Sequence, residues 1–258
     1  IYPIIIEVIT SERISVGKPY FNSTAIPILL PGFLLMSIAP VLSWQTNKIN
    51  KQKNYLFIFL SISILTFCIS YFTSFNVWGF VGITLGLIII ISSIYSIYNN
   101  YVKNNFKKFL QYNNALIAHT GVGIMILGIT CSSIFKYEIN DSFLVGEVKS
   151  YGNYSFELKS IEILEKKNFQ ELIALFVLYE KNKLLANIKP SKRYYHVSKM
   201  ITTEAGIYRY WYKDFYIVLG SETNNEWSIK IYQNPLVNFI WIGVFIMVFS
   251  GLCGIRRK

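Results

Sequence analysis

NYLFIFLSISILTFCISYFTSFNVWGFVGITLGLIIIISSIYSIYNNYV, residues 54–102, contains no Asp, Glu, Lys or Arg. A helix needs roughly 20 apolar residues to cross the hydrocarbon core of a bilayer, so this stretch is long enough for two crossings. The polar sequence Thr73-Ser74-Phe75-Asn76, near its middle, offers turn chemistry. We therefore predict two transmembrane helices, at about 54–73 and 77–98.

Three further stretches without charged residues are each long enough for one crossing. They predict spans at about 23–44, 115–135 and 235–254. The first contains Pro27, Pro31 and Pro40, so we expect a kinked or partly broken helix there. Residues 1–22 are mixed in character and are expected to form an outer surface segment. The predicted fold class is a membrane all-α protein with about five transmembrane helices.

Residues 136–234 lie between the last two spans and have a different pattern. Apolar and polar residues alternate over 154–159 and 227–231, as they do in half-buried strands. Turn signals such as Tyr151-Gly152-Asn153 separate the strand-like runs. About 100 residues can hold a core of their own. We predict one extramembrane β-rich domain, a small antiparallel barrel or sandwich, followed by the last helix and basic tail at 235–258.

The formal net charge of +11 is concentrated beside the predicted spans. Segments 45–53, 99–114 and 256–258 each hold three basic residues and no acidic one. This is the positive-inside pattern of membrane loops, and it argues against a nucleic-acid partner. It predicts that membrane lipid is a partner, that the C-terminus faces the matrix or cytoplasm, and that the β-rich domain lies outside. The three cysteines form no CxxC pair, so we expect neither a disulfide framework nor a cysteine metal site.

His119 is the clearest candidate for chemistry, because it lies inside the span at 115–135. An ionisable residue at membrane depth is costly and commonly functional, and neutral imidazole is a haem iron ligand. Gly123 lies one turn further on the same face, where a missing side chain would permit close approach of a flat macrocycle. The alternative is that His119 forms an ordinary hydrogen bond and Gly123 permits close helix packing.

The predicted outer domain contains weaker candidates. Lys192 and Arg193 could contact a propionate, a lipid phosphate or a protein partner, or form a solvated basic turn. His196 is more typical of a surface or sheet histidine. It cannot share an iron with His119, because the helix continues for about 24 Å beyond His119 before the outer domain begins. The aromatic stretch around Trp211 is more typical of a domain core or an interfacial belt than of a ligand-binding face.

Several motifs, in the same order along nearly the whole chain, resemble a known family. They are Gly17-Lys18-Pro19-Tyr20-Phe21-Asn22, Leu35-Met36-Ser37-Ile38-Ala39-Pro40, Ala118-His119-Thr120-Gly121-Val122-Gly123, Pro190-Ser191-Lys192-Arg193, Thr203-Glu204-Ala205, Asp214-Phe215-Tyr216-Ile217-Val218-Leu219-Gly220 and Ile240-Trp241-Ile242-Gly243. The chain thus resembles the C-terminal part of the CcmF/CycK/NrfE cytochrome c haem lyases. Lys18 and Ser191 depart from the commoner residues of that pattern.

The resemblance implies a role in cytochrome c maturation. Members bind haem b between transmembrane helices, receive a second haem from a haem carrier protein, and attach it to apocytochrome c. His119 matches one axial haem b ligand, so the metal it would bind is haem iron. The other haem ligands of the family precede this region. No catalytic residue is therefore assigned to this chain, and we do not expect it to be active alone.

The missing ligands are expected on a chain carrying the N-terminal half of the haem lyase, or on an upstream part of the same protein. A composition rich in Ile, Asn, Lys, Phe and Tyr favours an organellar genome, so we expect the mitochondrial inner membrane, with a bacterial inner membrane as the alternative. The β-rich domain would then lie in the intermembrane space or periplasm. A second hypothesis is a non-catalytic structural subunit of a respiratory membrane complex. A transporter is disfavoured because no inverted repeat is visible.

Overall fold

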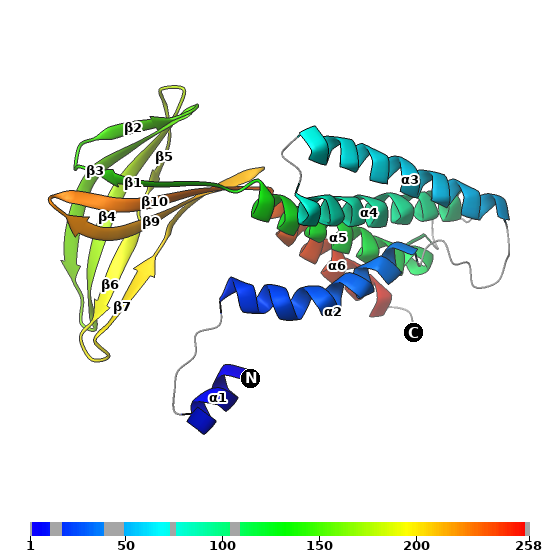
Figure 1. The fold of residues 1–258 in the computed structure, drawn as a ribbon, viewed down its shortest axis with the longest axis horizontal. Coiled ribbons are helices and arrows are strands. Elements are labelled where there is room, and N and C mark those ends of the chain that lie inside the picture. The colour runs from blue at the N-terminus through cyan, green and yellow to red at the C-terminus, as the bar shows by residue number, and fades with distance from the viewer. Residues whose placement is uncertain (1, 11–16, 39–48, 73–75, 104–108, 256–258) are drawn as a thin grey trace. The chain divides into compact units, whose positions relative to one another are not determined.

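Figure 1 shows the computed structural model of the protein, which describes residues 2–10, 17–38, 49–72, 76–103 and 109–255. The chain forms two compact units. The helical unit takes the described residues up to Phe72, then 80–124 and 243–255, whereas the β unit takes 76–79 and 125–242. Pro40, Trp44, the turn at 73–75 and the tail at 256–258 lie outside the described residues.

Helices make up the helical unit, and three of them, α4, α5 and α6, have one end in the β unit. The helices are α1 (Tyr2–Thr10), α2 (Lys18–Ile38), α3 (Ile49–Phe72), α4 (Val77–Lys103), α5 (Phe109–Ile134) and α6 (Val237–Ile255). Within the described residues, α3 to α6 are long and apolar enough to cross a membrane, but the apolar part of α2, Asn22–Ile38, is shorter. The predicted count of five spans is therefore not confirmed.

Two helix boundaries differ from the predicted spans for a physical reason. α3 begins at Ile49 and α4 continues to Lys103, so both include lysine-bearing sequence beyond the charge-free stretch. Charge decides where a helix leaves the hydrocarbon, whereas backbone hydrogen bonding decides where the helix ends. Pro27 and Pro31 both lie inside α2, which the structure forms as one helix.

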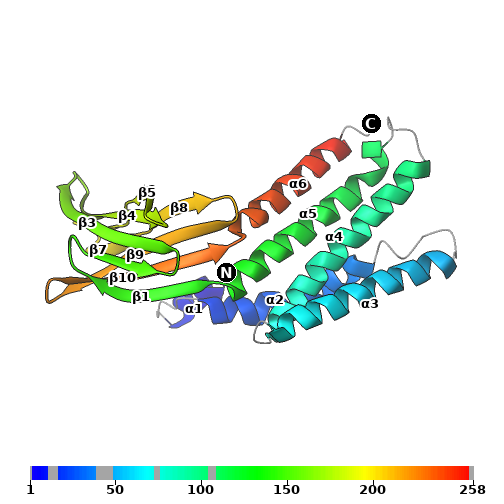
Figure 2. The same cartoon turned by 90° about the horizontal axis from the view of Figure 1, so that it is seen from above.

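Helices α3 to α6 run side by side in Figures 1 and 2. Hydroxyl pairs join α3 to α4: Thr66 Oγ1 and Thr84 Oγ1 are 2.6 Å apart, and Tyr55 bonds Ser96. The side chain of Asn76 accepts a bond from Gly79 N at 3.1 Å and so caps the start of α4. These bonds satisfy polar groups where lipid offers no partner.

The β unit is an antiparallel sandwich of two sheets. Its strands are β1 (Tyr137–Phe143), β2 (Val148–Tyr151), β3 (Tyr154–Glu165), β4 (Phe169–Glu180), β5 (Lys183–Ile188), β6 (Ser191–Tyr195), β7 (Met200–Glu204), β8 (Gly206–Tyr210), β9 (Lys213–Thr223) and β10 (Glu226–Pro235). One sheet has the order β1-β10-β9-β8 and the other β2-β3-β4-β6-β7, with β5 also paired to β4. The structure thus decides the choice between a barrel and a sandwich.

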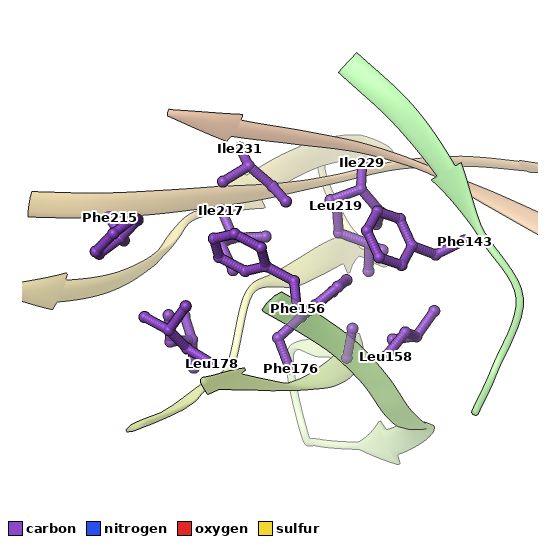
Figure 3. Packing of buried hydrophobic residues seen from close by; sticks show 12 residues of the cluster. Phe143, Phe156, Leu158, Phe176, Leu178, Phe215, Ile217, Leu219, Ile229 and Ile231 are labelled. Carbon is purple, nitrogen blue, oxygen red and sulfur yellow. The ribbon is translucent and has the colours of Figure 1, made fainter. Parts of the chain in front are cut away.

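The sandwich core lies between the two sheets, as Figure 3 shows. Phe156 and Phe176 from one sheet face Phe215 and Ile229 from the other, and all four are almost wholly buried. This is the alternation that the strand pattern predicts, with every second residue on the inner face. The hairpin between β9 and β10 turns at Asn224 and Asn225, which both have positive φ, as tight hairpin turns require.

Candidate functional site

His119 and Gly123 lie one turn apart on α5, on the face that packs against α4. A Cβ added to Gly123 would lie 2.9 Å from the carbonyl oxygen of Gly86 and 2.6 Å from Ile90 Cγ1. The backbones of α4 and α5 therefore approach closely at this point, as small residues allow in membrane helices. In this structure the neighbour of Gly123 is a helix, so the packing interpretation describes it.

The opposite face of α5 packs equally tightly against α6. A Cβ on Gly121 would lie 2.7 Å from the carbonyl oxygen of Gly243, and one on Gly128 would lie 2.7 Å from Ile240 N. Ser250 of α6 also donates a hydrogen bond to the carbonyl of Asn114. α5 is thus held between two helices through glycines on two faces, which fixes the direction in which His119 points.

The imidazole of His119 is partly buried and incompletely satisfied. Three buried side-chain atoms in the described part of the chain have no hydrogen-bond partner: Ser93 Oγ, His119 Nδ1 and Asp214 Oδ1. Buried polar atoms are nearly always paired, so an unpaired ring nitrogen needs an explanation. His119 Nδ1 therefore makes no ordinary hydrogen bond in the described part of the chain. A histidine that binds a metal uses one ring nitrogen for the metal and donates a hydrogen bond from the other. His119 suits this role if Nε2 binds the metal and Nδ1 gains an acceptor.

Arg193 of β6 is engaged in an ion-pair network. Its Nε donates to Glu171 Oε1 at 2.8 Å, and Ser191 Oγ donates to the same oxygen at 2.9 Å. Lys166 Nζ lies 3.1 Å from the other oxygen, Oε2. Burial raises the pKa of the Glu171 carboxyl, but the bonds from Arg193, Ser191 and Lys166 outweigh that effect and lower the pKa to about 2. The guanidinium is therefore paired within the sandwich while it stays partly exposed.

Lys192 lines a groove at one end of the sandwich, together with Arg193. The groove has a volume of about 210 Å³ and lies between Leu172 and Ile201 of one sheet and Glu222 and Trp227 of the other. These residues lie at the opposite end of the strands from Tyr137 and Pro235, where the sheet joins α5 and α6. Among the candidates predicted in the outer domain, Lys192 and Arg193 both line this groove, and Arg193 is also paired with Glu171.

The remaining candidates separate into surface and core. The side chain of His196 is 47% exposed, and its Nε2 lies 3.8 Å from Glu165 Oε2, as expected of a surface histidine. In the aromatic stretch, Phe215 is a core residue, whereas Trp211 is exposed in the turn between β8 and β9. That turn contacts the start of α6, because Asn238 Nδ2 donates to the carbonyl of Tyr210 at 2.7 Å. The aromatic stretch thus contributes Phe215 to the core of the sandwich and leaves Trp211 on the surface.

Three residues that were not among the predicted candidates are prominent in the structure. Glu171 anchors the ion-pair network, Ser93 has an unpaired hydroxyl, and Asp214 has an unpaired carboxylate oxygen. Burial raises the pKa of Asp214, and the positive charge of Arg209 partly opposes that rise. Spacing could have indicated Ser93, because it lies seven residues, or two helical turns, after Gly86 on the same face.

Comparison with known proteins finds relatives over nearly the whole chain. The family description "CcmF C-terminal beta-sandwich" matches residues 134–235. The protein CcmF of Haemophilus influenzae is 27% identical over 95% of this chain and 40% of its own length. CcmF of Escherichia coli is 26% identical over 93% of this chain and 37% of its own length. CycK of Rhizobium meliloti is 25% identical over the full chain.

One solved structure, titled "Cytochrome c Heme Lyase CcmF", has the same fold with a TM-score of 0.75. It is 17% identical to this chain and covers 98% of it, but the match spans 41% of the solved chain. The chain thus covers about two-fifths of the length of the relatives named here. The chain is similar over nearly its whole length to the cytochrome c biogenesis proteins CcmF and CycK, and its residues 134–235 match the C-terminal β-sandwich of CcmF.

Proposed function

We propose that this chain works in cytochrome c maturation as part of a haem lyase, with His119 as one axial ligand of a b-type haem. One observation carries the proposal: His119 lies in a membrane-length helix, with Nδ1 buried and unpaired, in a chain related to CcmF. An imidazole left unsatisfied at membrane depth is costly unless it has a function. Iron ligation through the other nitrogen is a function that neutral imidazole performs.

The residues around His119 define what this chain contributes. α5 is fixed on both sides by glycine contacts, so the ring direction is set by helix packing and not by a mobile loop. A bis-histidine site needs a second ligand, which we assign to the N-terminal half of the haem lyase, on another chain or further upstream. When bound, such a haem supplies electrons that keep the iron of the delivered haem reduced.

The same proposal gives the β unit the role of a contact surface. Residues 137–235 follow one membrane-length helix and precede another, so the sandwich lies on one side of the bilayer, which we take as the intermembrane space or periplasm. The positive segments at 45–53 and 99–114 then face the matrix or cytoplasm. The membrane is an inner membrane, mitochondrial or bacterial. The partners are the haem carrier and apocytochrome c.

Substitution of each histidine tests the haem assignment. The complex containing this chain is purified from its native membrane through a tag, and the optical spectrum of its haem is recorded. We expect His119→Ala to lose the b-type absorption and cytochrome c yield, because an axial ligand is removed. His196→Ala is the matched control, since that ring is exposed in the β unit, and it should change neither. A spectrum unchanged by His119→Ala contradicts the proposal.

Charge reversal tests the groove as the partner contact. Lys192 lines the groove, whereas Lys183 begins β5 at the other end of β4 and is exposed. We expect Lys192→Glu to weaken capture of apocytochrome c or haem carrier by the tagged complex about fivefold, in line with one charged contact. Lys183→Glu should leave capture unchanged. If both variants capture the partner equally well, the groove does not contact the partner.

A further inference from the structure

Ser93 is a buried serine of α4 whose hydroxyl has no partner within the described residues. Its two nearest serine neighbours on the helix behave differently. Ser92 Oγ donates to the carbonyl of Ile89 at 3.2 Å, and Ser96 Oγ is bonded to Tyr55. Ser93 is wholly buried, so water does not satisfy it either. An unpaired hydroxyl in an otherwise satisfied helix points to a partner absent from this arrangement of side chains.

The face of α4 that carries Ser93 is the face that packs against α5. At about 100° per residue, Ser93 lies about 20° around the helix from Gly86, which contacts Gly123 of α5. Thr84, bonded to Thr66 of α3, lies nine residues before Ser93 and so about 180° away. Ser93 therefore faces α5 and not α3.

The level of Ser93 along α4 matches the level of His119 along α5. The two helices are antiparallel, because Gly123 contacts Ile90 while Gly79 contacts Ile134. Gly123 lies level with the turn from Gly86 to Ile90. One turn towards the start of α5 brings His119, and one turn towards the end of α4 brings Ser93, since antiparallel helices advance in opposite directions. The two residues thus share one interface and one level.

Both residues also have an unpaired buried atom, and those atoms are complementary. Ser93 offers a hydroxyl oxygen that can accept, and His119 Nδ1 can carry the proton that it accepts. A histidine that ligates a metal through one nitrogen almost always donates its other N–H to an oxygen, which fixes the tautomer and raises ligand basicity. In the described part of the chain His119 Nδ1 has no such oxygen partner and is not bonded to Ser93, whose hydroxyl lies at the same level of the α4–α5 interface and is also unpaired.

We propose that Ser93 is a positioning residue for His119: its hydroxyl accepts a hydrogen bond from Nδ1–H and so leaves the Nε2 lone pair for haem iron. This inference rests on the proposed function, because it assumes that His119 is a ligand. It adds to the haem site a residue on a second helix, α4, and it specifies that His119 carries its proton on Nδ1. It also makes the α4–α5 contact at Gly86 and Gly123 part of the ligand site, because that contact sets the distance between the two helices.

The test compares two adjacent serines in the purified complex. Ser93→Ala removes the proposed acceptor, and Ser92→Ala makes the same change at a buried neighbour whose hydroxyl already bonds its own helix. We expect Ser93→Ala to lose haem to an acceptor protein about tenfold faster, the lower end of the effect of removing such a partner. Its haem midpoint potential should rise, because a less basic imidazole stabilises ferric iron less. Ser92→Ala should match the wild type in both readouts.

Two further variants keep the outcomes distinct. Ser93→Cys preserves most of the volume but offers a poor acceptor, so it should behave like Ser93→Ala and separates hydrogen bonding from packing. His119→Ala reports on the proposed function itself. If His119→Ala loses the haem while both Ser93 variants match Ser92→Ala, the role of Ser93 is wrong and the haem assignment stands. If His119→Ala retains the haem, the haem assignment fails first.

Discussion

The helical unit and the β unit satisfy polar groups and pack side chains in different ways. In the β unit a buried carboxylate such as Glu171 is surrounded by donors, and a continuous apolar core fills the space between the sheets. In the helical unit the contacts are glycines against backbone and hydroxyls against hydroxyls, while Phe57 and Phe245 are 73% and 70% exposed. The difference reflects the solvent: water drives the sandwich core together, whereas lipid accepts exposed phenylalanine.

The largest expected effect is on the free energy of unfolding, when a buried leucine is replaced by alanine in each of the two units. Leu178 lies in the sandwich core and Leu85 in α4, and both are buried. Leu178→Ala should destabilise the β unit by about 3 kcal/mol, because transfer energy and packing are both lost. Leu85→Ala should cost less, about 1 kcal/mol, because lipid and not water surrounds separated helices, so burial of Leu85 gains no hydrophobic transfer energy. Urea titration of the full chain in detergent micelles, read by protease resistance of each unit, measures both. Equal costs would contradict the contrast.

The next effect concerns the glycine contacts of the helical unit. Gly121→Ala places a methyl group 2.7 Å from the carbonyl of Gly243, so α5 and α6 must separate, at a cost of about 2 kcal/mol. Gly251→Ala is the matched control, because nothing lies within 4 Å of its added Cβ. The thermal midpoint in micelles should fall for the first and stay constant for the second. A midpoint unchanged in Gly121→Ala would show that the helices do not need this approach.

A pH-dependent effect of similar or smaller size sharpens the description of the β unit. The folded pKa of Glu171, about 2, lies below its ordinary value of 4.5. A depressed carboxyl pKa contributes stability above pH 4.5 that is lost as the pH falls towards 2. Glu171→Gln should therefore cost about 2 kcal/mol at pH 7 and little at pH 2.

Protease resistance of the β unit at the two pH values measures this dependence. Glu162→Gln is the control, because Glu162 is an exposed carboxylate on the neighbouring strand β3, and it should lower stability at neither pH. A Glu171→Gln penalty that is the same at both pH values would mean that the charge of the carboxylate is not what stabilises the sandwich.

Much of the fold could be predicted because it depends on local pattern. The charge-free run at 54–102 indicates two helices, and α3 and α4 occupy it. The alternation at 154–159 indicates a strand, and β3 contains it. Apolar length and period are properties of neighbouring residues, so they need no knowledge of the tertiary structure. The fifth span is not confirmed, because the described apolar part of α2, Asn22–Ile38, is shorter than a membrane crossing and the rest of the predicted span at 23–44 lies outside the described residues.

The candidate site was predicted less completely, because its details depend on pairing between distant segments. His119 is conspicuous as an ionisable residue in an apolar run. The pairing of Arg193 with Glu171 depends on the register of β6 against β4, and no local pattern specifies that register. The same holds for Gly123, whose neighbour could be a ligand or a helix until the position of α4 is known. Ser93 likewise becomes a candidate only when the packing of α4 against α5 is known.

The pairing of β1 with β10 has a consequence for how the protein is made. Tyr137 pairs with Gln233, so the first strand of the sandwich lies beside the last. During synthesis the sheet edge at β1 stays open until almost the whole segment has left the ribosome. Closing so long a loop is slow, and an open edge invites other strands. The edge of β1 that β10 covers is therefore free to pair with other strands until β10 has been made, shortly before the last helix.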